Sequence, residues 1–355
     1  MTSRIEIDLG AFRANVHTLA QIAAPSATML AVKADGYGHG MLPLARAGVE
    51  AGATALAVLE IDAALELRRG GIEVPLFAWL HGADAAFGPA IEHDVDLGVS
   101  ALHELRRIGE AAGAAGKPAA VHLKIDTGLH RNGASPDDWP ALVTEALALA
   151  AAGRVRIAGL WSHLADASPE DDAVALAGFR AAVAVAGELG VPLEGPDRPL
   201  LHLAASSAGI RMPEARFDLV RFGIAAYGSS PFDDVDAAGI GMRPPMTVFA
   251  TVVASHGGVA TLDLGSADGI PPSVLGASGS GAEVLLAGER ARVLTVGVDT
   301  TEVASEAPVG SEAIVFGPGD SGEPTAEQWA AWAGTIGDEI LVDASKRIPR
   351  VYLDG

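Results

Sequence analysis

The alternation of short apolar runs with longer, alanine-rich amphipathic stretches constrains the fold more than any other feature of this chain. Runs that are apolar along their whole length are typical of strands in a parallel sheet covered on both faces, and the stretches between them fit helical crossovers. Roughly eight such runs predict an α/β fold of the TIM (β/α)8 barrel type. They span residues 29–34, 55–60, 75–80, 94–99, 120–126, 155–163, 199–207 and 219–228.

Helices are expected between these strands, notably over residues 101–115, 137–152 and 170–189. Ser100 precedes the first, and Ser135-Pro136-Asp137 precedes the second. Such residues cap helix N-termini.

The pattern changes after about residue 232 to β-rich runs without long helices. We therefore expect a mainly antiparallel β domain after the barrel. A chain of 355 residues has room for both, and we divide it into a cofactor-binding barrel at 1–235 and a C-terminal β domain at 236–355. The β-rich runs are TVFATVVASH, VATLDLG, AEVLLAG, ARVLTVGVD, EAIVFG, DEILVD and RIPRVYL.

Charge and cysteine content exclude several classes of function. The net charge of −21 is spread without a basic stripe, which argues against nucleic acid and anionic membranes as partners. No segment has the composition of a membrane span, and MTSRIEIDLG lacks the apolar core of a signal peptide. The absence of cysteine fits a cytoplasmic location, and ten scattered histidines without an HExxH pattern give no reason to expect a metal.

Functional groups of a TIM barrel gather where strands end, so the polar residues at those ends are the candidates. A lysine there, Lys33, is costly to bury unless it is paired or used. Its amine could form a Schiff base with an aldehyde cofactor, or it could extend to solvent from the barrel rim. The candidates are Lys33, Tyr37, Lys124, Asp126, Arg131, His163, His202, Ser206, Ser207, Arg221, Gly223 and Tyr227.

The last strand end has the composition of a phosphate cradle. Arg221 is followed by Gly223-Ile224, whose backbone N–H groups suit phosphate, and Ser206 could add a hydroxyl. Arg221 could instead form an ion pair with Asp218. His163 could stack on a planar ring or be an ordinary core histidine.

The segment AVKADGYGHG around Lys33 closely resembles the lysine signature of alanine racemases, which use pyridoxal 5′-phosphate (PLP). Further similar segments follow in the family's order and cover essentially the whole chain, from IEIDLGAFRANV to RIPRVY. They are HLKIDTGLHRNG, GLWSHLADAS, FDLVRFGIAAYG, ATLDLGSADG and DEILVDASKRIPRVY.

This resemblance implies roles for the candidates. Lys33 would form the internal aldimine, His163 would stack near the ring, and Arg221 would face the pyridine nitrogen. Because a guanidinium does not give up its proton, the ring would stay neutral and a limited electron sink, which favours racemases over decarboxylases. Phosphate would contact Tyr37, Ser206, Gly223 and Ile224, while Lys124 and Arg131 would lie beside the phenolic oxygen and the substrate carboxylate.

The chain departs from the family pattern at the second catalytic base. Alanine racemases pair the lysine with a tyrosine of a GYADG motif from the partner subunit, and here the motif is GSADG with Ser266. A serine hydroxyl is a poor replacement for a phenol of pKa about 10. Asp338 stands where a phosphate-contacting tyrosine is expected, Ala205 replaces an asparagine, and Val298 replaces a methionine next to Asp299. In the homodimer that the resemblance implies, Ser266 and Asp299 would serve the partner's site.

We therefore expect a PLP enzyme that acts at Cα of a small or polar amino acid, with Lys33 and Ser266 at the catalytic positions. Efficient two-base alanine racemisation is not expected. Cleavage of β-hydroxy amino acids by an aldolase or lyase reaction, a non-catalytic PLP-binding protein, and a barrel that binds no PLP are the alternatives. The substrate and the carbamylation state of Lys124 stay open.

Overall fold

The computed structural model describes residues 3–275, 281–344 and 347–354. The chain divides into two compact units. The barrel unit contains Val16–Lys33 and Gly48–Gly223, and the β unit contains Met1–Asn15, Ala34–Ala47 and Ile224–Gly355. Each is described by itself.

The sheet of the barrel unit is parallel, in the order β8-β7-β6-β5-β4-β3-β2-β9. Backbone bonds from Asp218 N to Leu201 O (3.0 Å) and from Arg221 N to Ala204 O (3.1 Å) join its two end strands. The predicted (β/α)8 barrel is therefore confirmed. Its strands are β2 Ala27–Ala31, β3 Ala55–Val58, β4 Leu76–Ala78, β5 Val95–Val99, β6 Ala119–Lys124, β7 Val155–Trp161, β8 Leu200–His202 and β9 Leu219–Phe222.

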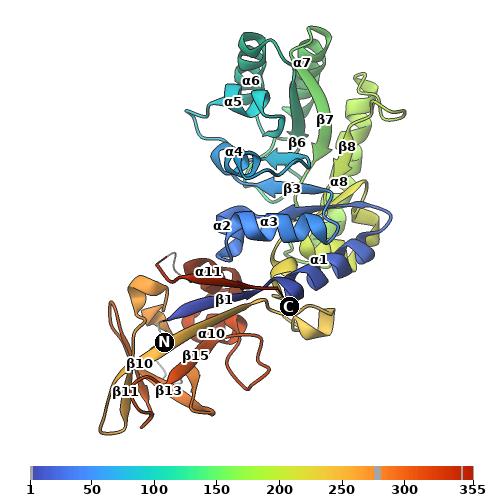
Figure 1. The fold of residues 1–355 in the computed structure, drawn as a ribbon. Coiled ribbons are helices and arrows are strands. Elements are labelled where there is room, and N and C mark those ends of the chain that lie inside the picture. Colours follow the sequence, from blue (N-terminus) through green and yellow to red (C-terminus); the bar gives the residue numbers. More distant parts are fainter. Residues whose placement is uncertain (1–2, 276–280, 345–346, 355) are drawn as a thin grey trace. The chain divides into compact units, whose positions relative to one another are not determined.

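The three expected helices correspond to α6 (Leu102–Ala115), α7 (Trp139–Ala151) and α8 (Pro169–Glu188). Helices α6 and α7 pack against each other and against β7 (Figure 1). The other helical segments that lie wholly in this unit are α4 Ile61–Arg69, α5 Phe87–Glu92, α9 Ser206–Arg211 and the 3-10 turn η1 Pro213–Ala215.

Capping at these helices follows the prediction only in part. Ser135 Oγ accepts the N–H of Asp138 at 3.1 Å, just before α7 begins. The prediction for Ser100 is wrong, because the N-cap of α6 is Ala101. The carboxylate of Glu104 accepts the N–H groups of both Ser100 and Ala101 and replaces the missing side-chain cap.

Small residues and aromatic rings share the interior of the barrel unit. Trp161 and Phe77 meet edge to face, with ring centroids 5.3 Å apart. The buried cluster consists of Met29, Ala31, Ala55, Ala57, Phe77, Trp161 and Leu219.

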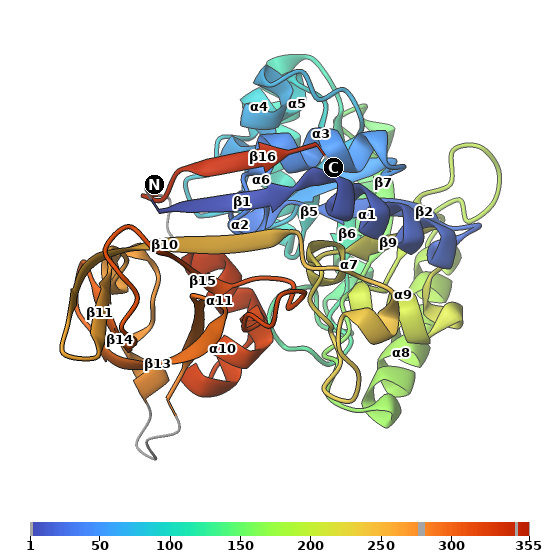
Figure 2. The same ribbon diagram turned by 60° about the horizontal axis from the view of Figure 1, so that its bottom comes forward.

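The sheet of the β unit has the order β11-β14-β13-β12-β15-β10-β1-β16, and β11 also pairs with β10 (Figure 2). Its described pairings are antiparallel except the parallel pair β1–β16, so the predicted antiparallel domain is confirmed. Its strands are β1 Arg4–Asp8, β10 Met246–His256, β11 Val259–Leu262, β12 Glu283–Leu286, β13 Glu289–Val296, β14 Thr301–Ala304, β15 Glu312–Phe316 and β16 Arg350–Leu353.

Helical segments complete the β unit. α1 (Leu9–Ala23) and α3 (Met41–Glu50) begin in the β unit and end in the barrel unit. In α2 (Lys33–Tyr37), the first residue belongs to the barrel unit and the others belong to the β unit. The others are η2 Ile224–Tyr227, η3 Ala238–Ile240, η4 Ser266–Asp268, η5 Pro272–Leu275, α10 Ala326–Ala333 and α11 Gly337–Asp343.

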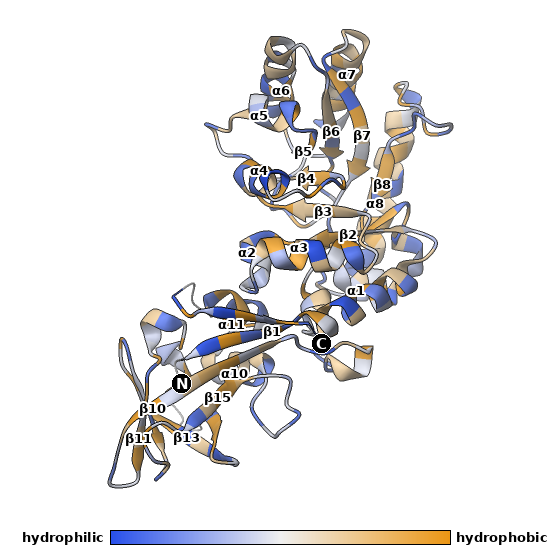
Figure 3. Cartoon of the chain, in the orientation of Figure 1, coloured by the Kyte–Doolittle hydropathy of each residue, from blue (hydrophilic) through white to orange (hydrophobic). Residues whose placement is uncertain are grey.

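Two features of the β unit differ from the prediction or were missed. The run DEILVD at 338–343 is helix α11 and not a strand, since Asp338 and Glu339 in its first turn interact favourably with a helix N-terminus. Strand β1 was not predicted, although its alternating burial, visible as alternating hydropathy in Figure 3, is typical of a strand. Its position between β10 and β16 depends on pairing partners far away in the sequence.

No helix in the described part of the chain is long and apolar enough to cross a membrane.

Candidate active site

Strand ends of the barrel unit bring five of the predicted site residues together. Lys33 follows β2, Lys124 ends β6, and Arg221 lies in β9. The pKa of His163 is lowered well below its usual value, first by burial and then by the charges of Arg221, Arg131, Lys124 and Lys33. Those four basic side chains therefore lie near one imidazole, and such a cluster is suited to anionic groups of a cofactor or substrate.

Arg221 is the most tightly held of these side chains. It is 7% exposed, and its Nη2 donates to Ser162 O at 2.8 Å and to Leu203 O at 2.9 Å. Nη2 also lies 3.1 Å from His163 Nδ1, and Nη1 lies 2.9 Å from His202 Nδ1. These contacts fix the plane of the guanidinium.

The guanidinium retains donors for a ligand. Of its five N–H groups, those on Nη2 and one on Nη1 have acceptors, while Nε and the second Nη1 hydrogen meet no acceptor in the described residues. Burial, and to a smaller extent Arg131, lowers the pKa of Arg221 to about 9, so that it remains a cation at neutral pH. A fixed, charged donor with spare N–H groups fits the pyridine nitrogen that the resemblance places there.

His163 is neutral in this environment. Because Arg221 can only donate, Nδ1 of His163 must be the acceptor and its proton must lie on Nε2. A neutral, half-buried imidazole fixed at its edge is suited to stack on a planar ring. The geometry therefore fits the predicted role, and the contact with Arg221 shows that this histidine is not an isolated core residue.

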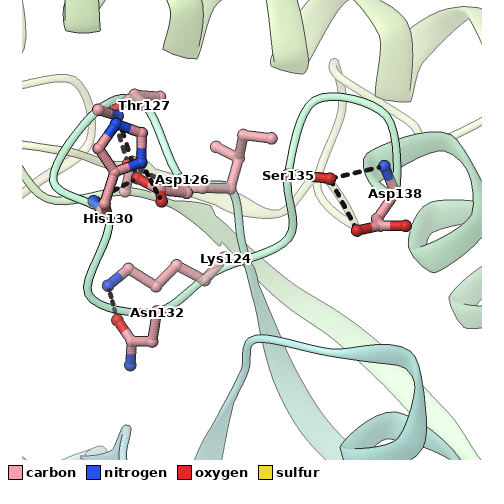
Figure 4. Close-up of polar contacts among 10 residues, drawn as sticks. Lys124, Asp126, Thr127, His130, Asn132, Ser135 and Asp138 are labelled. Atoms are coloured by element: carbon pink, nitrogen blue, oxygen red, sulfur yellow. Dashed lines mark hydrogen bonds and ion pairs between the residues drawn. The ribbon is translucent and has the colours of Figure 1, made fainter.

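Lys124 is buried among polar and aromatic groups. Its Nζ donates to Asn132 Oδ1, as Figure 4 shows, and lies 4.5 Å from the centre of the Trp161 ring. Burial and the charges of Arg221 and Arg131 lower its pKa to about 7, against a smaller opposing effect of Asp126. A substantial fraction of this amine is therefore uncharged at neutral pH.

The loop after β6 connects Lys124 to Arg131, which is exposed. Asp126 accepts the backbone N–H groups of Gly128 and His130, and its other oxygen lies 3.3 Å from the His130 ring (Figure 4). These backbone bonds lower the pKa of Asp126 against the effect of its burial. Asp126 thus shapes the loop that presents Arg131.

Two predicted phosphate contacts of the barrel unit meet directly. Ser206, the first residue of α9, is 5% exposed, and its Oγ accepts the N–H of Gly223 at 3.1 Å. The predicted alternative for Arg221, an ion pair with Asp218, is wrong, since both Asp218 oxygens bind Arg198 at 2.7 and 2.6 Å. Arg221 therefore makes no ion pair with Asp218, and its guanidinium can take part in the candidate active site.

The remaining phosphate candidates, Tyr37 and Ile224, lie in the β unit. Tyr37 is buried in a left-handed turn (φ 49°), and its ring centroid is 4.6 Å from that of Tyr227. Burial, and then the charge of Asp338, raises the pKa of the Tyr37 hydroxyl. Asp338 therefore lies close enough to Tyr37 for its charge to act on the hydroxyl, and its place near phosphate stays a prediction.

Ser266 and Asp299 belong to adjacent loops of the β unit. Ser266 and Ala267 donate backbone hydrogen bonds of 2.9 Å each to Gly297 O and Val298 O. Gly265 is required there, because a Cβ would lie 2.4 Å from Val298 O. The two residues that the resemblance assigns to the partner's site are therefore neighbours.

Sequence analysis missed His122, Trp161, Ser162 and Asn132, and named His202 without a role. His122 could have been found, because it precedes Lys124 by two residues in a strand and so lies on the same face. The contacts of Ser162 and Leu203 are made by backbone carbonyls, for which side-chain patterns carry no signal.

Comparison with known proteins shows similarity along nearly the whole chain. The family model described as "Alanine racemase, N-terminal domain" matches residues 7–231, and "Alanine racemase, C-terminal domain" matches residues 250–352. An alanine racemase of Frankia casuarinae is 42% identical over 374 residues, covering 98% of this chain and 95% of the relative.

Solved structures of alanine racemases are similar to this chain over its whole length. An alanine racemase from D-cycloserine-producing Streptomyces lavendulae superposes with a TM-score of 0.92 at 39% identity, covering 100% of this chain and 98% of that one. The alanine racemase of Streptomyces coelicolor A3(2) gives a TM-score of 0.93 at 40% identity, with the same coverage.

Proposed function

The chain belongs to the alanine racemase family, and from this premise we propose that it removes and returns a proton at Cα of a small or polar amino acid. Enzymes of the family are PLP-dependent racemases, so the enzyme class and the cofactor expected from the sequence are confirmed at the level of the family. The observation that carries the proposal is the buried Arg221, which has two unused N–H donors in the described residues and belongs to the group of basic side chains near His163.

We propose that Lys33 holds the cofactor through its amine and that Arg221 donates to the pyridine nitrogen. Bound PLP would withdraw electrons from Cα and so acidify the Cα–H bond. His163 would stack near the ring, and Ser206, Gly223, Tyr37 and Ile224 would bind phosphate. Because Arg221 keeps its proton, it would leave the ring neutral and would limit the reactions that need a stronger electron sink.

Arg131 and Lys124 are the proposed substrate-side groups. The guanidinium of Arg131 suits a carboxylate, which it can bind through two parallel N–H groups. Lys124, whose pKa is about 7, would lie beside the phenolic oxygen. Asp299, with Ser266, would complete the partner's site.

We propose that the reaction relies on one base. Lys33 would take the proton from Cα on one face and return it to that same face, which exchanges the proton without inverting the centre. Inversion needs a second proton donor on the opposite face, and the hydroxyl of Ser266 is far weaker as an acid or base near neutral pH than a phenol. Exchange with solvent should therefore exceed racemisation.

The test compares these two rates in deuterium oxide. For the PLP-loaded protein with each alanine enantiomer, we expect deuterium incorporation at Cα of one enantiomer to be much faster than its conversion to the other. Ser266→Tyr should raise racemisation relative to exchange, and Lys33→Ala should abolish both. Equal rates of exchange and racemisation in both directions for the unchanged protein would overturn the one-base proposal.

Ser266 also leaves more room than a tyrosine, which favours two alternatives. A side chain with a β-hydroxyl could be accommodated, and Cα–Cβ cleavage would then release glycine and an aldehyde. A non-catalytic PLP-binding protein would show spectral changes with amino acids but no exchange. The same assay distinguishes them when it is repeated with β-hydroxy amino acids and when the products are identified by NMR.

We propose a homodimer in which Ser266 serves the partner's site. If so, the racemisation gained in Ser266→Tyr should disappear in mixed dimers with excess Lys33→Ala, because the only intact Lys33 would then face the serine of the other subunit. Retention of the gain would place both residues in one subunit's site. The domain boundary at residues 235 and 236 and the cytoplasmic location remain predictions.

A further inference from the structure

A continuous line of polar groups crosses the interior of the barrel unit, where branched apolar side chains are usual. Arg221 Nη1 lies 2.9 Å from His202 Nδ1, and His202 Nε2 lies 2.8 Å from His122 Nδ1. His122 Nε2 lies 3.3 Å from Asp96 Oδ2. The two histidines are 0% and 1% exposed, so that each ring nitrogen depends on its protein partner.

Only one arrangement of protons satisfies every contact in this line. A guanidinium can only donate, so His202 accepts at Nδ1 and carries its proton on Nε2. That proton is donated to His122 Nδ1, which leaves the His122 proton on Nε2, and Asp96 accepts it as a carboxylate. If His202 carried its proton on Nδ1 instead, two buried donors would face each other at 2.9 Å.

The surroundings hold the two imidazoles in place. Gly159 leaves the space that His122 occupies, because a Cβ there would lie 2.2 Å from His122 Nδ1. Phe77 packs against His122 with ring centroids 4.7 Å apart, and Trp161 stacks on His202 at 5.6 Å. The rings therefore cannot turn freely to exchange their nitrogens.

The line ends at the opposite end of the barrel from the candidate active site. Asp96 is the second residue of β5, and its side chain is 24% exposed. It borders a cleft of about 440 Å³ at the amino ends of β5, β6 and β7, which Arg68, Lys117 and Arg156 also line. This carboxylate is the last acceptor of the line.

We propose that Asp96 and His122 are positioning residues for Arg221. Arg221 sets the tautomers because it can only donate, and the hydrogen bonds to His122 and Asp96 hold the His202 ring where its Nδ1 accepts from Nη1. In this way they keep the guanidinium in the plane of its other contacts. The line itself is independent of any cofactor. Only the statement that Arg221 faces the pyridine nitrogen rests on the proposed function.

The test measures histidine tautomers in the protein without PLP, by 15N NMR of labelled imidazoles. In the unchanged protein at neutral pH, His122 and His202 should both carry the proton on Nε2. Asp96→Ala removes the terminal acceptor, so the 15N signal of the protonated His122 Nε2 should shift, while Arg221 keeps both rings in the Nε2 tautomer. Asp96→Leu, which has the same branched shape and no acceptor, replaces it if the alanine variant does not fold.

Asp94→Gly is the matched control, since Asp94 is a second carboxylate of the same cleft and its φ of 54° suits glycine. It should leave the His122 Nε2 signal unchanged. In the PLP-loaded protein, Asp96→Ala should slow Cα exchange on the order of tenfold, as expected for the loss of one charge-assisted hydrogen bond, and Asp94→Gly should not.

A proton on Nδ1 of either histidine in the unchanged protein, or identical imidazole signals in Asp96→Ala, would overturn the proposal. Because the NMR experiment uses the protein without PLP, it remains decisive if the protein proves to lack the proposed activity. A shifted His122 Nε2 signal in Asp96→Ala without any effect on exchange in an active enzyme would also refute the positioning role.

Discussion

Replacing Gly159 with alanine should strongly destabilise the protein. The new Cβ would lie 2.2 Å from His122 Nδ1 and 2.8 Å from two ring carbons, so that the imidazole must move. Overpacking of a core costs about 1–3 kcal/mol, and loss of the buried hydrogen bond to His202 adds about 1–3 kcal/mol. We expect a loss of about 2–6 kcal/mol in the free energy of unfolding.

Urea unfolding at one fixed protein concentration measures this loss, because the stability of a dimer depends on concentration. Gly88→Ala in helix α5 is the control, since its Cβ meets nothing within 4 Å and alanine is favoured in a helix by ~1 kcal/mol. In a His122→Ala background, Gly159→Ala should cost much less. A Gly159→Ala variant within about 0.5 kcal/mol of the unchanged protein would refute the packing argument.

Three further results are expected. Because the folded-state pKa of Lys124 is about 7, below the 10.5 of a free lysine, the unfolded chain binds an extra proton between these values. Stability should therefore rise with pH over that window in CO2-free buffer, and urea midpoints of Lys124→Met should show a smaller rise. Asp338→Asn removes a negative charge near Tyr37, the proposed phosphate contact. Two charges about 4 Å apart in water repel by ~1 kcal/mol, so the affinity for PLP, measured by fluorescence titration, should rise about fivefold. Unchanged affinity would show that Asp338 does not face phosphate. Thr325→Ala removes the N-cap of α10, whose Oγ1 accepts Gln328 N, and should cost ~1 kcal/mol in urea unfolding; no loss would show that the cap is solvated equally well.

The barrel could be predicted from the sequence because its strands are mostly apolar and alternate with helical stretches. The convergence of Lys33, Lys124, His163 and Arg221 could be predicted for the same reason, since parallel strands end at one edge. In contrast, β1 is a short segment whose place depends on β10 and β16, more than a hundred residues away for each. Local pattern carries no information on such a pairing.

The polar line through the barrel shows another limit of sequence analysis. His122 and His202 each stand alone in an apolar strand, and a single histidine there is usually an ordinary core residue. Their connection becomes visible only when the barrel places β5, β6, β8 and β9 around a common interior. For α10, by contrast, the signal was present, because Thr325 and Gln328 form a capping box and Gly334 ends the helix in the left-handed region.

The measurement that tests the central claim most directly is borohydride reduction of the PLP-treated protein, followed by mass spectrometry of its peptides. Reduction fixes the cofactor to the amine that holds it. Lys124 provides an internal comparison, since its pKa of about 7 makes its amine a competing nucleophile near neutral pH. We predict that the cofactor mass is found on the peptide that contains Lys33. Its presence on the Lys124 peptide instead, or its absence from both, would contradict the account.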